Sequence, residues 1–113
     1  MKRILFSLLL GLSTTAAVAE VAVPEKAATC VACHGEAGAK PILPTYPVLA
    51  GQYANYLEYS LHEYQDGRRK NAVMAAQAAG LSKQEIKALA RYFAAQPGPL
   101  YTPSIAGASG AHP

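Results

Sequence analysis

The chain has 113 residues, enough for one domain, and its ten basic and seven acidic residues give a formal net charge of +3. Two of the basic residues, Lys2 and Arg3, lie in an N-terminal segment that we expect to be removed, which leaves eight basic against seven acidic residues. A chain so nearly neutral lacks the strong basic patch of nucleic-acid-binding proteins, so this class is excluded.

Residues 1–19 are predicted to be a secretory signal peptide. Lys2 and Arg3 precede an apolar run from Ile4 to Leu12, and Ala17-Val18-Ala19 is a small-residue cleavage site. A membrane anchor is the alternative, but a spanning helix needs about 20 apolar residues and this run is far shorter. We therefore expect cleavage after Ala19, export to the periplasm, and a mature protein that does not span a membrane.

A C-x-x-C-H string runs from Cys30 to His34, in a segment predicted to start extended at residue 20 and to form a short helix with Pro24 in its first turn. Two cysteines in an exported protein can form a disulfide, and a C-x-x-C pair can be a thiol–disulfide oxidoreductase site. The complete string is the signature of covalent haem attachment, because two thiols add across the two haem vinyl groups and the next residue lies under the iron. No strand–helix–strand pattern surrounds the pair. The string therefore predicts one haem c held by Cys30 and Cys33, with His34 as an iron ligand.

The following segment is predicted to be a loop over residues 35–51, rich in glycine and proline, and then an amphipathic helix over residues 52–66 that ends at Gly67. His62 falls opposite the predicted inward face of this helix and is expected to face solvent. Arg68-Arg69-Lys70 is interpreted either as a solvated basic turn or as a contact to a haem propionate or a partner protein. The predicted inward face contains six residues at helical spacing: Tyr53, Tyr56, Leu57, Ser60, Leu61 and Tyr64.

Residues 71–80 are a small-residue stretch that holds Met74, the one methionine left after cleavage. A lone methionine is often a core filler. Beside a haem motif, however, a thioether on the second face of the iron would raise the reduction potential and suit electron transfer. His62 and His112 are poorer candidates, because one faces away and the other lies near the C-terminus. We predict His34 and Met74 as the axial pair, with a bis-histidine or an open site as alternatives.

The last predicted helix begins with a capping box, Ser82 to Glu85, and ends at Pro97-Gly98-Pro99. Residues 97–113 are rich in proline, glycine and alanine and are expected to be a flexible tail. No run alternates as a strand, so the domain over residues 20–96 is predicted to be all-α. The apolar face of the last helix contains Ile86, Leu89, Ala90 and Phe93.

Across roughly residues 25–96 the chain resembles the monohaem class I c-type cytochromes, especially small bacterial ones whose fold also occurs duplicated in dihaem cytochromes. The resemblance implies the small class I cytochrome c fold, with three to five helices packed around one covalent haem. The matching segments are CVACHG at 30–35, YPVLAGQ at 46–52, Tyr56-Leu57, residues 68–74, and LSKQEIKALARYF at 81–93.

The resemblance also implies roles for single residues. Pro47 is similar to the proline whose carbonyl accepts a hydrogen bond from the proximal imidazole, and Leu49 to the leucine that packs on the haem face. The first and last helices are expected to cross, which would bring Cys30 near Tyr92 and Phe93.

We expect a one-electron carrier rather than an enzyme, with redox proteins as partners and no small-molecule substrate. The alternative is a haem c subunit of a periplasmic oxidoreductase complex, of the flavocytochrome or sulfur-compound dehydrogenase type. A gas-binding or peroxidase-like haem protein needs an open sixth position, and Met74 argues against this class.

Overall fold

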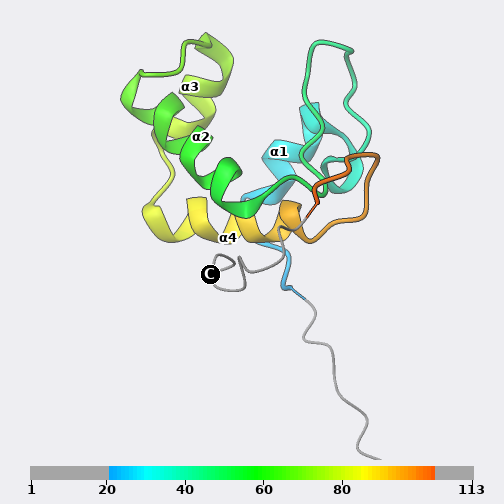
Figure 1. The fold of residues 1–113 in the computed structure, drawn as a ribbon. Helices are drawn as coiled ribbons and strands as arrows, with labels where there is room; N and C mark the ends of the chain where they lie inside the picture. The colour runs from blue at the N-terminus through cyan, green and yellow to red at the C-terminus, as the bar shows by residue number, and fades with distance from the viewer. Residues whose placement is uncertain (1–20, 104–113) are drawn as a thin grey trace, which may run out of the picture.

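A computed structural model describes residues 21–103, and the predicted signal peptide and His112 lie outside this range. Helices are the one type of regular structure in the described residues, which confirms the predicted all-α class (Figure 1). No helix among these residues has the length and apolar character needed to cross a bilayer. The elements are α1 (Ala27–His34), the 3-10 turn η1 (Glu36–Gly38), α2 (Ala54–Asp66), α3 (Ala72–Ala79) and α4 (Lys83–Ala94).

The helix boundaries follow local signals in the sequence. Gly67 ends α2 in the left-handed conformation, with φ of 79°. At the start of α4, the Glu85 amide donates to the Ser82 hydroxyl at 3.2 Å, and the Ser82 amide donates to the Glu85 carboxylate at 2.7 Å. The N-terminal boundary of α1 differs from the prediction, because Pro24 lies in a preceding turn whose carbonyl accepts from the Ala27 amide at 3.0 Å.

The core lies where α1 and α2 meet α4. In Figure 1, α4 forms the base, α2 packs against both α3 and α4, and α1 and α3 stand apart on the same side of α4. Small residues allow the close approach of α1, since Ala27 and Ala90 are almost fully buried in one cluster. Burial of the larger members stabilises the fold by about 1.5–3 kcal/mol for each side chain. The cluster contains Ala27, Leu57, Leu89, Ala90 and Phe93.

The long segment between η1 and α2 is anchored through its backbone. The carbonyl of Gly38 accepts hydrogen bonds from the amides of Leu49 at 2.8 Å and Ala50 at 3.1 Å. The amide of Gly51 donates to the carbonyl of Phe93 in α4 at 3.1 Å. These bonds fix both ends of the loop that contains Pro47, although the loop has no periodic structure of its own.

Residues 97–103 follow α4 and return to the start of α2. The hydroxyl of Thr102 donates to the carbonyl of Gly51 at 2.7 Å, and the hydroxyl of Tyr53 donates to the carbonyl of Pro103. Thr102 and Pro103, which belong to the segment predicted to be a tail, therefore have defined partners in the domain.

The buried face of α2 is narrower than predicted. Leu57 and Ser60 are buried, but the Tyr56 side chain is 46 % exposed because its hydroxyl and ring are directed to Arg69 rather than to the core. His62 is partly buried instead of facing solvent, since α2 is covered by α4 on one side and by α3 on another.

Candidate functional site

Cys30 and Cys33 lie three residues apart on α1, so one helical turn separates the two thiols. Both are free and partly buried. Burial raises the pKa of the Cys30 thiol above its ordinary value. An oxidoreductase nucleophile needs the opposite, a lowered thiol pKa that yields the thiolate near neutral pH. This thiol therefore lacks the activation expected of a catalytic C-x-x-C site.

His34, the last residue of α1, is 6 % exposed and has one defined hydrogen-bond partner. Its Nδ1 lies 2.7 Å from the carbonyl oxygen of Pro47. A carbonyl oxygen can only accept a hydrogen bond, so Nδ1 must carry the proton. Nε2 of the neutral imidazole then has a free lone pair, the form in which histidine binds a metal. The structure thus contains the hydrogen bond that the sequence resemblance implies for Pro47.

The loop residues beside His34 form the remainder of this side of the site. The ring of Tyr46 lies at a tilt to the imidazole, with 6.3 Å between the ring centroids. Leu49 is partly buried and packs against the core cluster. Cys30 and Tyr92 also pack against this cluster, which contains Phe93, in agreement with the expected approach of the first and last helices.

Met74 lies in the first turn of α3, the helix that stands apart from α1 in Figure 1. Its side chain is partly buried. The Asn71 side chain caps α3 by accepting a hydrogen bond from the Met74 amide at 3.0 Å, so the methionine has a fixed place at the start of its helix. The remaining described histidine, His62, is in the middle of α2.

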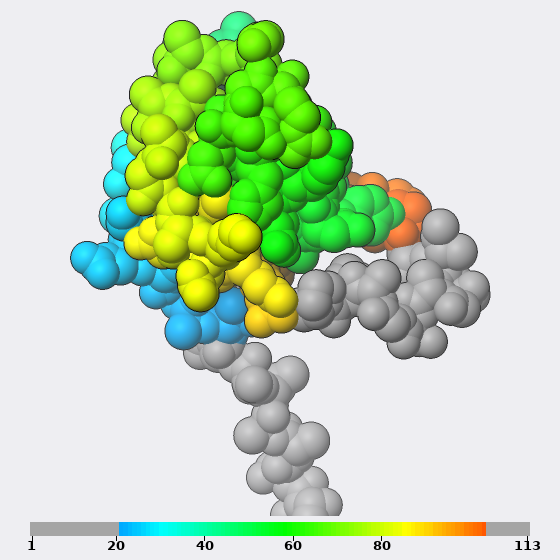
Figure 2. All heavy atoms as spheres, turned by 90° about the vertical axis from the view of Figure 1, so that its left-hand side faces the viewer, coloured from blue at the N-terminus to red at the C-terminus, as the bar shows by residue number. Residues whose placement is uncertain are grey.

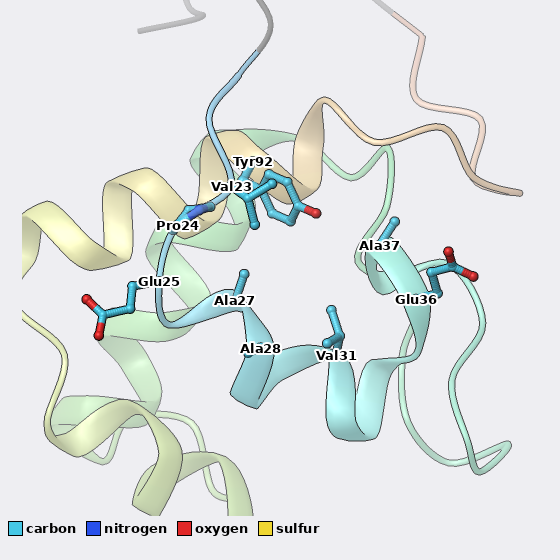
Figure 3. A pocket seen from close by; sticks show the side chains of 9 residues that line it. All are labelled: Val23, Pro24, Glu25, Ala27, Ala28, Val31, Glu36, Ala37 and Tyr92. Carbon is cyan, nitrogen blue, oxygen red and sulfur yellow. The ribbon is translucent and has the colours of Figure 1, made fainter.

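A surface pocket of about 410 Å³ lies on another side of α1, between that helix, the N-terminal segment and Tyr92 (Figure 3). Its lining includes Val23, Ala28, Val31 and Tyr92 but neither cysteine, His34 or Met74. The carboxylates of Glu25 and Glu36 point away from its centre in Figure 3. The pocket is therefore separate from the residues predicted to bind haem.

In the basic turn after α2, Arg68 and Lys70 are exposed and Arg69 is partly buried, and both arginines have specific contacts. Arg68 pairs with Asp66 at 2.8 Å and lies over the Tyr59 ring, while Arg69 contacts Tyr56. Hydrogen bonds to carboxylate and hydroxyl raise the pKa of both guanidinium groups, and the Arg69 contact lowers the pKa of Tyr56. These contacts were not predicted from the sequence. The signal for them is the spacing of Tyr56, Ser60 and Tyr64, which recur every four residues and therefore lie on one face of α2.

Comparison with known proteins gives one consistent result. The sequence profile of the family described as Cytochrome c matches residues 25–96, which is more than half of the chain. Cytochrome c-554(548) of Halomonas halodenitrificans is 47% identical over 75 residues, which cover 64% of this chain and 89% of that protein. The thiosulfate dehydrogenase electron acceptor of Thiomonas intermedia is 43% identical over 94 residues, 82% of this chain and 43% of that protein.

The fold is also similar to a solved structure. Reduced recombinant cytochrome c4 from Pseudomonas stutzeri matches with a TM-score of 0.56 and 33% sequence identity, over 60% of this chain and 38% of that chain. The present chain therefore spans most of the Halomonas relative, but less than half of the Thiomonas and Pseudomonas proteins.

Proposed function

Because the chain belongs to the cytochrome c family, we propose that Cys30, Cys33 and His34 hold its haem and that it is a one-electron carrier of the periplasm. Family membership makes the protein a monohaem class I c-type cytochrome with covalently bound haem c, an electron-transfer protein rather than a catalytic enzyme. Its partners are redox proteins.

The burial of His34 and its hydrogen bond to Pro47 are the observation that supports the proposal. Its buried imidazole donates Nδ1–H to the Pro47 carbonyl, which leaves the Nε2 lone pair available to iron. Two free thiols precede it on the same helix, Cys33 directly and Cys30 one turn earlier, and are available for thioether bonds. The residues present therefore fit a covalent haem c whose proximal ligand is already held in one tautomer and one orientation.

The remaining roles follow from the environment of each residue. When bound, haem c supplies an iron that cycles between the ferric and ferrous states. The Pro47 carbonyl increases the donor strength of His34 by accepting a hydrogen bond from Nδ1–H, and Leu49 supplies an apolar side chain from the same loop. Met74 would hold the iron through its thioether as the second protein ligand, and a methionine ligand favours a high reduction potential.

Three experiments test the covalent attachment of the haem and the sixth ligand. Acid-acetone extraction should leave the haem on the polypeptide, and a double Cys30→Ala/Cys33→Ala variant should lose covalent haem. Met74→Ala should remove the methionine–iron charge-transfer band and lower the reduction potential, while Val73→Ala, at an exposed neighbour on α3, should preserve both. Survival of the band and the potential in Met74→Ala would show that another group is the sixth ligand.

The location is tested at the N-terminus. The predicted signal peptide and the cleavage site after Ala19 motivate export. N-terminal sequencing of the haem-loaded protein from a periplasmic fraction should start at Glu20. A haem protein that starts at Met1 in the cytoplasmic fraction would contradict export.

A second candidate function is that of an electron acceptor or haem subunit of a sulfur-compound oxidoreductase. The Thiomonas relative, named as an acceptor for thiosulfate dehydrogenase, favours it. An apolar surface beside the site fits a protein partner: Ile42 is 63 % exposed and Leu43 47 % exposed, and the Ile42 amide donates to the Cys33 carbonyl at 3.1 Å.

The apolar loop is tested as the contact with an oxidoreductase partner. A double Ile42→Ser/Leu43→Ser variant should slow electron transfer from an oxidoreductase partner, and Val23→Ser, at a similarly exposed site on the N-terminal segment, should not. Gel filtration of the native periplasmic fraction, followed at the haem absorption band, then distinguishes the forms. A free carrier elutes near the size of the chain, and a permanent subunit elutes with its catalytic partner.

A further inference from the structure

Arg69 folds back over α2 instead of extending into solvent. Three residues spaced by four, Tyr56, Ser60 and Tyr64, form a stripe along the helix beneath it. Its Nη1 donates to the Tyr56 hydroxyl at 3.2 Å and to the buried Ser60 hydroxyl at 3.0 Å. Its guanidinium carbon lies 5.9 Å from the Tyr56 ring centroid and 5.1 Å from that of Tyr64, within the range of cation–π attraction.

The backbone of the same residue fixes the turn that leads into α3. The Arg69 amide donates to the Glu63 carbonyl at 3.1 Å. Two residues later Asn71 caps α3 through the Met74 amide, and its carbonyl accepts from the Ala75 amide at 2.8 Å. The start of α3, where Met74 lies, is therefore tied to α2 through Arg69.

Gln65 ties the other end of α3 to the same helix. Its side-chain amide donates to the carbonyl of Ala78 at 3.0 Å and to that of Leu81 at 2.8 Å. The Ala78 carbonyl lies in the last turn of α3, and the Leu81 carbonyl lies just beyond it. Carbonyls at the end of a helix lack the amide donors that a following helical turn would supply. Figure 2 shows α2 and α3 side by side on this face of the molecule, with α4 beneath them.

We propose that Gln65 and Arg69 are positioning residues that clamp both ends of α3 onto α2, and thereby hold the Met74 thioether where it would ligate the haem iron. The clamp rests on the proposed function, since its role depends on ligation by Met74. An eight-residue helix is too short to be stable alone, so its position depends on tertiary contacts such as these.

Arg68 provides a matched control. It neighbours Arg69 and has the same charge, but its guanidinium is paired with Asp66 and Tyr59 on the exposed side of the turn. Arg68→Gln and Arg69→Gln therefore change the net charge equally, while Arg69→Gln alone removes the contacts to the stripe. Gln65→Met keeps the length of the side chain and removes its two donors.

The test uses the haem-loaded ferric protein and two readouts. The first is hydrogen exchange of the α3 amides, and the second is the rate at which added imidazole displaces the sixth ligand. We expect both rates to rise about tenfold in Arg69→Gln and in Gln65→Met, which corresponds to the loss of about 1.4 kcal/mol. Arg68→Gln should stay within twofold of the wild type. Arg69→Lys should give an intermediate increase, because a lysine keeps the charge but not the planar fork.

The outcomes separate the clamp from the proposed ligation. Unchanged α3 exchange in both Arg69→Gln and Gln65→Met would overturn the clamp. Faster exchange without faster imidazole binding would overturn its positioning role, provided that Met74→Ala binds imidazole faster than the wild type. If Met74→Ala and the wild type bind imidazole equally fast, ligation by Met74 is wrong, and the α3 exchange rates still decide whether the clamp exists.

Discussion

Replacing Gly38 by alanine tests how closely the loop of the site is packed on the core. Gly38 has φ of +71°, a conformation that costs a residue with a side chain about 1–2 kcal/mol. A Cβ here would lie 2.8 Å from Cδ1 of Phe93 and 3.0 Å from Cβ of Leu49. Ordinary carbon contacts are about 3.5–4.0 Å, so the methyl group overlaps both neighbours, and overpacking of this kind costs about 1–3 kcal/mol.

The two effects together predict a loss of about 2–5 kcal/mol in Gly38→Ala, a large share of the roughly 5–15 kcal/mol that stabilises a typical domain. Guanidinium unfolding of the haem-loaded protein, followed by far-ultraviolet circular dichroism, measures this loss as a lower midpoint at an unchanged slope. Gly38 also accepts hydrogen bonds from Leu49 and Ala50, so the displacement should reach the loop that contains Pro47.

Gly80→Ala is the matched control. Gly80 has φ of −94°, and a Cβ there would meet no atom within 4 Å. The substitution should leave the free energy of unfolding unchanged or raise it by up to about 1 kcal/mol, through the lower entropy of the unfolded chain. If Gly38→Ala is as stable as Gly80→Ala, the reasoning from the conformation and contacts of Gly38 is wrong.

Three further substitutions test the core and the start of α4. Leu89→Ala should cost about 2–5 kcal/mol in urea unfolding, because Leu89 is 1 % exposed in the core cluster. Ala90→Leu should cost about 1–3 kcal/mol or more, since a larger side chain forces α1 away from α4. Glu85→Gln should destabilise the protein at neutral pH but less at acid pH. Hydrogen bonds from Ser82 lower the pKa of Glu85 in the folded state. The stability that the ionised Glu85 contributes is therefore complete above the ordinary pKa of 4.5, and it declines as the pH falls through the lowered pKa of the folded state.

Each of these expectations has a result that contradicts it. Leu100→Ala and Ala88→Leu change more exposed positions and should have small effects, so equal losses in these controls would contradict the argument from burial. For Glu85, a stability difference between wild type and Glu85→Gln that stays constant from pH 7 to pH 3 would contradict the assignment of a lowered pKa.

The features that could be predicted from sequence are those set by short-range spacing. Ser82 and Glu85 are three residues apart, and both bonds of their capping box depend on one turn of helix. The cysteines and His34 are similarly local, because all three lie within the last five residues of α1. The same reasoning gave Gly67 as the end of α2, since a glycine readily takes the left-handed conformation.

Contacts that join distant, aperiodic segments could not be derived in this way. The bond between His34 and Pro47 spans 13 residues of loop, and only the family resemblance indicated it. The face of α2 was predicted too wide because helical periodicity cannot show that Arg69 returns over Tyr56. A pattern of side chains also does not predict the backbone hydrogen bonds that the Gly38 carbonyl accepts.

The return of residues 97–103 bears on where the domain can be cut for expression. The family match ends at residue 96, which invites a shortened chain that stops there. Such a chain would lack the Thr102 hydroxyl that bonds the Gly51 carbonyl and the Pro103 carbonyl that accepts from Tyr53. Gly51 directly follows the loop of Pro47 and Leu49, so truncation would loosen the start of α2 beside the loop that bonds His34. A recombinant domain should therefore extend to residue 103 or beyond.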